Sequence, residues 1–489
     1  MSHLLTALPA LHLTATPFSS DPKTGASSGD SAWMLTSAAL VLLMTPGLAF
    51  FYGGLTRAKS TLNMMMMSFV SIGVVSLLWV LYGFSIAFTD NSGHKSLFGA
   101  HHLWFLNNLG VDKGGSYILG TPDNVFVMFQ LMFAIITVAL ISGSLADRTK
   151  FGGWVAFSIL WATIVYFPVA DWVFNFGVPA GTGDKVGNGV ASLYKYGSGG
   201  WIVNRLGAFD FAGGTAVHIN AGAAALACCL VVGKRKGWPQ QIVKPHNVPS
   251  VLLGAGLLWF GWFGFNAGSA LLANGTAGQA FVNTQLATAV AGLAWIGTEK
   301  IRDGHATNVG FASGAVAGLV AITPACGFVN SMGAVAIGAV AGGLCCLAVA
   351  LKYRLGFDDS LDVVGVHLVG GIAGTLLIGL LATKKVNNTA DGLFFGGGFS
   401  QLGKQAIAAG AVLVYSFVLS YIIAQLVDKT IGFRIKEDDE LEGIDITTHA
   451  ESAYDLMGSG TTGSLIAANT TSPINPPATG PTGSTRVEV

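Results

Sequence analysis

Long apolar segments recur along almost the whole chain, and they determine the solvent in which it can fold. A helix needs roughly 20 apolar residues to cross a bilayer, and eleven segments come close to or exceed that length. They cover approximately residues 32–54, 64–88, 124–146, 152–174, 211–233, 250–272, 282–299, 307–325, 331–351, 363–383 and 403–427. Backbone polar groups cannot stay unpaired in lipid, so these segments are expected to be helices. The sequence therefore predicts an all-α polytopic membrane protein with eleven transmembrane helices.

Charge is scarce and lies mostly between these segments. Charged residues make up 10% of the chain, against about 25% in soluble domains, and the formal net charge of zero provides no basic face for nucleic acid. Without metal-ligand spacing, the cysteines are expected to be small packing residues: Cys228, Cys229, Cys326, Cys345 and Cys346. No nucleophile–base constellation or phosphate-binding loop is visible, so we expect neither an enzyme nor a cofactor.

The placement of lysine and arginine predicts the orientation. An odd number of spans puts the two termini on opposite sides, and short cytoplasmic loops are enriched in positive charge. With the N-terminus outside, the cytoplasmic loops hold the denser set: Arg57, Lys59, Arg148, Lys150, Lys234, Arg235, Lys236, Lys244, Lys300, Arg302, Lys352 and Arg354. We therefore expect an extracellular lead (1–31), an eleven-helix membrane domain (32–428), a cytoplasmic segment (429–457) and a Gly/Ser/Thr/Pro-rich disordered tail (458–489).

Two histidines stand inside apolar segments. His218 lies eight residues after Asp210 in the fifth segment, and His367 lies five residues after Asp362 in the tenth. With the predicted orientation, segments 1–5 and 6–10 form two five-helix halves of opposite topology, and inverted repeats of this kind place a substrate site at their interface. Ionisable side chains at membrane depth normally face a pore or a partner. The alternative is a neutral histidine that is hydrogen-bonded between helices.

A metal site is discounted, because no Cys, Asp or Glu lies at mid-depth near either histidine. Two neutral imidazoles in contact could share one proton and still offer a donor and an acceptor to a small solute. Asp210 and Asp362 each precede an apolar helix, so each is also a candidate helix N-cap.

Several motifs in order resemble the ammonium transporter family (Amt/Mep/Rh) over about residues 32–455. They are Pro46-Gly-Leu-Ala-Phe-Phe-Tyr-Gly-Gly-Leu-Thr-Arg57, Asp210-Phe-Ala-Gly-Gly-Thr-Ala-Val-His218-Ile-Asn220, Gly261-Trp-Phe-Gly-Phe-Asn-Ala-Gly-Ser269 and Asp362-Val-Val-Gly-Val-His367. The presence of both histidines is similar to the twin-histidine members of bacteria, plants and fungi. The resemblance implies a homotrimer in the plasma membrane, with one pore in each subunit.

The resemblance also implies roles for individual residues. Phe133 and Phe265 resemble the stacked aromatic gate that precedes the histidines. Ser269, Asp210, Phe174 and Phe129 fall at the ammonium-recruitment site. Family members usually present tryptophan where this chain has Phe174, and Trp172 is two residues earlier, which puts the strength of cation binding in doubt. A ring face attracts a partly dehydrated cation, so an aromatic vestibule is physically reasonable.

The segment after the last span resembles the cytoplasmic regulatory region of the family. It reads Ile431-Gly-Phe-Arg434-Ile-Lys-Glu-Asp-Asp-Glu440-Leu-Glu-Gly443-Ile-Asp445. The resemblance implies that this segment docks under the subunits and couples their activity, with a kinase or regulatory protein as its partner. The alternative is an ordinary solvated tail.

The expected function is uptake of ammonium, or methylammonium, across the lipid bilayer. The recruited ion would lose its proton, neutral ammonia would cross, and the proton would be relayed by the histidines. Potassium is similar in size but cannot give up a proton, and no carbonyl filter of the potassium-channel type occurs. Electrogenic transfer is preferred, with a passive Rh-like ammonia channel as the alternative. A third reading is an ammonium sensor that signals through its tail.

Overall fold

The computed structural model describes residues 26–89, 101–107, 109, 117, 120–177, 193–194, 199–241 and 244–454. Within these ranges the regular structure is helical apart from isolated β-bridges such as those of Thr149 with Arg434 and Val329 with Ala382. Most of the predicted lead and the whole of the predicted tail 458–489 lie outside the described residues.

Ten helical segments of the described chain are long and apolar enough to cross a membrane. Several are continuous runs of shorter elements, such as α2 (Thr61–Leu78), the π-helical turn η2 (Trp79–Gly83) and α3 (Phe84–Phe88). The ten are Ser28–Leu55 (α1), Ala58–Phe88, Asp123–Leu145 (α4 with η4), Phe151–Phe174 (α5, η5, α6), Gly214–Val232 (η7, α9), Val248–Gly268 (α10), Gly275–Asp303 (α11), Ser331–Leu355 (α13, α14), Val364–Leu381 (η8, α15) and Ser400–Thr430 (α17). Each coincides with one of the expected segments.

The remaining expected segment, 307–325, is the shorter apolar helix α12 (Asn308–Ile322). Fifteen residues span about 22 Å, which is less than the roughly 30 Å of the hydrocarbon core. Thr307 caps the first turn with its side chain, and the chain leaves the helix in a turn after Thr323. The helix nevertheless packs on α10, α11, α13 and α15, so it belongs to the bundle.

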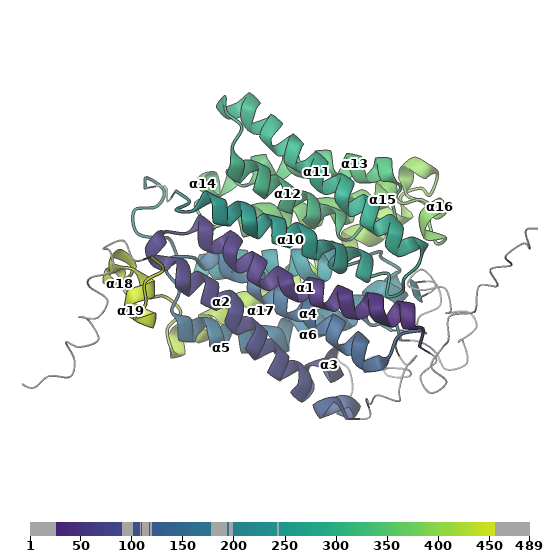
Figure 1. The fold of residues 1–489 in the computed structure, drawn as a ribbon, viewed down its shortest axis with the longest axis horizontal. Coiled ribbons are helices and arrows are strands. Elements are labelled where there is room, and N and C mark those ends of the chain that lie inside the picture. The colour runs from purple at the N-terminus through teal and green to yellow at the C-terminus, as the bar shows by residue number, and fades with distance from the viewer. Residues whose placement is uncertain are drawn as a thin grey trace, which may run out of the picture.

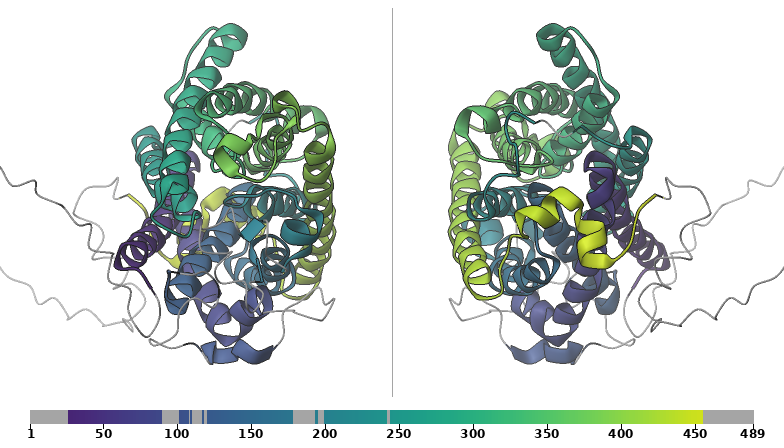
Figure 2. Two further views of the ribbon diagram at one scale, coloured as in Figure 1. Left: turned by 90° about the vertical axis from the view of Figure 1, so that its right-hand side faces the viewer. Right: turned by 90° about the vertical axis from the view of Figure 1, so that its left-hand side faces the viewer.

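The helices form two groups that face each other. In the end views, α1–α9 make up one group and α10–α15 the other, while α17 runs along the side of both (Figure 2). The most extensive contact between the groups joins α1 and α10. It depends on small residues, because a Cβ atom at Gly254 would lie 2.3 Å from the backbone nitrogen of Phe51. Close approach of this kind is how helices associate in lipid.

The outer faces of the helices are apolar and uncovered. Leu293 of α11 is 61% exposed and Val414 of α17 is 59% exposed, which is expected where lipid replaces water. The start of α1 and the short C-terminal helices α18 (Glu437–Glu442) and α19 (Ile444–His449) lie at opposite ends of the molecule (Figure 1).

Candidate functional site

Both membrane-embedded histidines lie in π-helical turns rather than in regular α-helix. His218 is in η7 (Gly214–Ile219), which continues into α9 (Asn220–Val232). His367 is in η8 (Val364–Leu368), which continues into α15 (Val369–Leu381). π-helical turns are rare and are frequent at functional sites. The two histidines therefore occupy equivalent positions in the two groups of helices.

A buried carboxylate fixes the start of each of these turns. Asp210 accepts hydrogen bonds from the backbone N–H groups of Gly213 (2.8 Å), Gly214 (2.6 Å) and Thr215 (2.7 Å). Asp359 accepts from Val363 (3.1 Å) and Val364 (2.7 Å) in the same way. Each aspartate precedes its histidine by eight residues, so the capping arrangement repeats in both halves.

Asp362 lies at the start of the helix as predicted, where its carbonyl oxygen accepts from the N–H of Val366 at 2.9 Å, but its side chain does not cap the first turn. Asp362 has a left-handed φ of 64°, which turns its carboxylate away from the helix N-terminus. It pairs with Lys352 at 2.7 Å instead. The Lys352 ammonium also donates to the carbonyl oxygen of Asp359 at 2.9 Å, so the ion pair supports the loop that holds the true cap.

Glycines let the two histidine-bearing helices cross at close range. A Cβ atom at Gly371 would lie 3.1 Å from the Cβ atom of His218, and one at Gly222 would lie 2.5 Å from the backbone nitrogen of Leu368. Any side chain at these two positions would push the helices apart.

The two imidazoles are in direct contact. The Nδ1 atoms of His218 and His367 are 3.3 Å apart, and the ring centroids are 5.3 Å apart at an interplanar angle of 29°. Both rings are buried, and Nε2 of His218 has no hydrogen-bond partner within the described part of the protein. A hydrogen bond between the two Nδ1 atoms needs one of them as donor and the other as acceptor.

Among the described residues, no group of three or more His, Cys, Asp or Glu side chains is arranged to hold a metal ion. The carboxylates of Asp210 and Asp359 accept from backbone N–H groups, and that of Asp362 pairs with Lys352.

The pair borders a narrow lumen with an apolar lining. The cavity has a volume of about 10 Å³, close to the minimum for a single water molecule. Trp262 covers one side, with its ring stacked on His218 at 5.5 Å between centroids, and its indole N–H donates to Thr323 at 2.8 Å. The other lining residues include Met44, Leu48, Ile136, Leu140, Leu258 and Val316.

Stacked phenylalanines close one end of this lumen. Phe133 of α4 (Asp123–Ile141) lies on Phe265 of α10 with centroids 4.1 Å apart, and both are almost fully buried. Phe129 and Phe174 contact the edge of Phe133 at 5.0 and 5.8 Å. Ser269 is one turn beyond Phe265, and its hydroxyl donates to the Phe265 carbonyl at 2.7 Å. The structure thus brings together the four phenylalanines and the serine that the sequence singled out.

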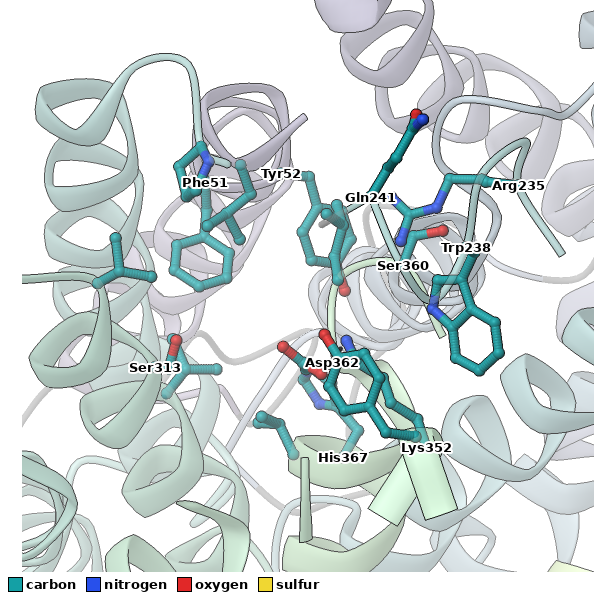
Figure 3. Close-up of a pocket in the computed structure, with 17 residues that line it drawn as sticks. Phe51, Tyr52, Arg235, Trp238, Gln241, Ser313, Lys352, Ser360, Asp362 and His367 are labelled. Atoms are coloured by element: carbon teal, nitrogen blue, oxygen red, sulfur yellow. Dashed lines mark hydrogen bonds and ion pairs between the residues drawn. The ribbon is translucent and has the colours of Figure 1, made fainter. Parts of the chain in front are cut away.

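A larger vestibule opens at the other end, toward the C-terminal segment. It has a volume of about 230 Å³ and reaches His367, with the side chains of Lys352 and Asp362 beside the histidine (Figure 3). Phe51 lines both this vestibule and the narrow lumen. Phe51 therefore stands where the lumen widens.

The segment after α17 is docked on this same end of the bundle. Residues 433–435 pair with the loop between the third and fourth spans, because Lys150 N–H donates to the Phe433 carbonyl at 2.9 Å and Ile435 N–H donates to the Arg148 carbonyl at 3.1 Å. Arg434 donates to the carbonyl oxygen of Val232 at 3.0 Å, at the end of the His218 helix. Figure 2 shows α18 and α19 lying across this face.

The remaining predicted residues of this segment are anchored as well. Glu440 is buried, pairs with Arg434 at 2.9 Å and accepts from the backbone N–H of Lys236 at 2.7 Å. Gly443 has a φ of 127° and leaves no room for a side chain against Lys59. Asp445 accepts from the N–H groups of residues 62 and 63 at 3.0 and 2.8 Å, at the first turn of α2.

Three features of the site were missed by reasoning from the sequence. Asp359 is signalled by the spacing of eight residues before its histidine, which repeats the spacing of Asp210 and His218. Trp262 is signalled by its position three residues before Phe265, on the same helical face. No pattern in the sequence signals the π-helical turns.

The chain is similar to known ammonium transporters. A model described as Ammonium Transporter Family matches residues 32–454. An ammonium transporter of Mycobacterium tuberculosis is 57% identical over 446 residues, which cover 88% of this chain and 90% of the relative. An ammonium transporter of Bacillus subtilis is 43% identical over 428 residues, with 87% and 98% covered.

Solved structures agree in fold. Mep2 of Saccharomyces cerevisiae aligns with a TM-score of 0.75 at 35% identity and covers 85% of this chain and 89% of the other. A structure titled Sensor Amt Protein aligns with a TM-score of 0.75 at 28% identity, with 86% and 98% covered. The relatives are transporters and not enzymes. Together with the family match across most of its length, these likenesses show that this multi-pass membrane protein belongs to the ammonium transporter family.

Proposed function

We propose that the protein takes up ammonium through this lumen by removing a proton from the ion, conducting ammonia past the histidine pair and moving net charge. The observation that carries the proposal is the direct contact of two buried imidazoles beside a lumen of about 10 Å³. The lumen is too small and too apolar for a hydrated ion, whereas ammonia is about the size of a water molecule.

Selection against potassium follows from the same arrangement. An ammonium ion held near Ser269 and the phenylalanine rings loses part of its water to cation–π contacts. It then gives one proton to the relay and crosses as ammonia, while potassium has no proton to give. Asp210 acts on the recruited cation through its field alone, because its oxygens are already bonded to backbone N–H groups.

The proposed topology has eleven spans, with α12 as the eighth, an extracellular N-terminus and a cytoplasmic C-terminus. The placement of α1 and the docked segment at opposite ends of the molecule supports an odd number of crossings (Figure 1). In this topology the loops that are rich in Lys and Arg lie on the cytoplasmic side of the plasma membrane, together with α18 and α19. We further place the chain in a homotrimer, with apolar helix faces packed between subunits.

Regulation through the C-terminal segment is part of the proposal. The segment contacts the end of the His218 helix through Arg434 and the start of α2 through Asp445, so a kinase or regulatory protein that released it would act on pore-forming helices. A sensor role is a second candidate, supported by the likeness to the Sensor Amt Protein structure.

Current recording in proteoliposomes tests the proposal. The wild-type protein should give a current on an ammonium jump and little on a potassium jump. His218→Ala and His367→Ala should admit water and let potassium permeate or compete. His305→Ala, in an exposed loop, is the matched control and should behave as wild type.

Two results would contradict the proposal in different ways. Ammonium flux without current in the wild-type protein would favour the passive ammonia channel. Wild-type selectivity in both pore variants would mean that the histidines have a purely structural role. In that case each variant should lose about 1–3 kcal/mol of folding stability through the lost buried hydrogen bond.

A further inference from the structure

Gln405 of α17 is a buried glutamine that belongs to none of the motifs that resemble the ammonium transporter family. Gln405 is fully buried, although the opposite face of the same helix is exposed at Ile407 and Val414. A polar amide in such surroundings is costly unless all its hydrogen bonds are made.

All four hydrogen-bonding positions of this amide are used. Its oxygen accepts from the backbone N–H of Phe209 at 2.7 Å and from the side-chain amide of Gln401 at 3.1 Å. Its nitrogen donates to the carbonyl oxygen of Phe209 at 2.7 Å and to that of Thr375 at 3.2 Å. The orientation of the amide is determined, because the flipped form would set its nitrogen against the Phe209 N–H.

These bonds join the His367 helix to the loop that leads into the His218 helix. Phe209 immediately precedes Asp210, which caps the turn that holds His218. Thr375 belongs to α15, eight residues after His367. Eight residues correspond to about 12 Å of helix, so Gln405 holds α15 about two turns beyond His367 and, through Phe209, holds the loop that leads into the Asp210 cap.

We propose that Gln405 is a positioning residue for the twin histidines: it sets the distance and angle between η7 and α15, and therefore the contact of the two imidazoles. The inference rests on the proposed function, since it concerns how the relay is held. The glycine contacts described above allow the helices to approach, but they do not fix the register along their axes. The bidentate bond to Phe209 together with the bond to Thr375 supplies that register.

The experiment compares Gln405→Met with wild type in proteoliposomes. Methionine keeps the length of the side chain and removes all four hydrogen bonds. We expect the ammonium-to-potassium selectivity to fall on the order of tenfold to a hundredfold, which is the range expected for a small misplacement of reacting groups. The ammonium concentration that gives half of the maximal current should change little, because the substitution leaves the recruitment site at Ser269 unchanged. Gln425→Met, at a partly exposed glutamine of the same helix that bonds to Tyr421, is the control and should leave selectivity unchanged.

Gln405→Glu keeps an acceptor for the Phe209 N–H and replaces Gln405→Met if the latter fails to assemble. Wild-type selectivity in a folded Gln405 variant would overturn the inference, and lower yield or melting temperature alone would show only a role in stability. A second test uses the His367→Ala background, in which adding Gln405→Met should cause no further loss of selectivity. A further, additive loss would show that Gln405 acts elsewhere. Absence of ammonium current in the wild-type protein would refute the proposed function instead.

Discussion

Replacement of Asp445 by alanine should release the C-terminal segment from the bundle. The Asp445 carboxylate is 2% exposed and accepts two backbone N–H bonds at the first turn of α2, 3.0 and 2.8 Å long. Loss of a capping side chain costs about 1 kcal/mol, and loss of a negative charge at a helix N-terminus costs about 1 kcal/mol more. The sum, about 2 kcal/mol, lowers the ratio of docked to released segment about 30-fold, since each 1.4 kcal/mol is a factor of ten.

Trypsin cleavage after Lys436 measures this release, because the docked segment is held on both sides of that residue by Arg434 and Glu440. The cleavage rate of Asp445→Ala should exceed that of wild type, and the ammonium current per folded protein should fall. Glu442→Ala removes an exposed carboxylate from the same segment and is the matched control.

The result of this assay can refute the reasoning at two levels. An unchanged cleavage rate in Asp445→Ala would mean that the α2 cap does not hold the segment. Faster cleavage with an unchanged current would confirm the docking energetics and contradict regulation of transport by the segment.

Phe265→Ala should change selectivity or rate while the protein still folds, because Phe265 closes the lumen; loss of assembly, measured by gel filtration, would identify a packing residue instead. Truncation after Asp428 should lower the current at equal membrane levels, since it leaves the Lys150 N–H without its carbonyl partner; unchanged uptake would contradict a regulatory segment. Burial, together with the charge of Asp362, raises the pKa of Asp359 to about 6. The folded protein then binds this proton more tightly than the unfolded chain, so its melting temperature should fall as pH rises from about 4 to 6, and Asp359→Asn should lack that dependence.

The spans were predictable because lipid imposes a simple rule. Segments of about 20 apolar residues must be helices in a bilayer, and the observed elements begin and end within a few residues of the expected ones for most spans. α12 shows the limit of the rule, since the expected segment 307–325 includes residues that form the flanking turns. Hydropathy alone does not show where a helix ends inside an apolar run.

The site was predictable in its members and less so in its geometry. The histidines, phenylalanines and Ser269 come together as the motifs indicate. The cap in the second half was assigned to Asp362 because it is nearest to the helix, whereas the left-handed backbone at that residue turns its side chain outward and leaves the role to Asp359. The choice between these neighbouring aspartates follows from comparing the two halves, because only Asp359 repeats the eight-position spacing of Asp210 and His218.

The π-helical turns at His218 and His367 make this lumen sensitive to changes in chain length. A π-helical turn holds more residues than an α-helical turn, so deletion of one residue within η7 would let the turn close as regular α-helix. Asp210 and His218 would then stand seven positions apart, and the cap and the imidazole contact could not both be kept. The lumen therefore depends on chain length as well as on side chains: each aspartate and its histidine stand eight positions apart in both halves, and this spacing must be kept.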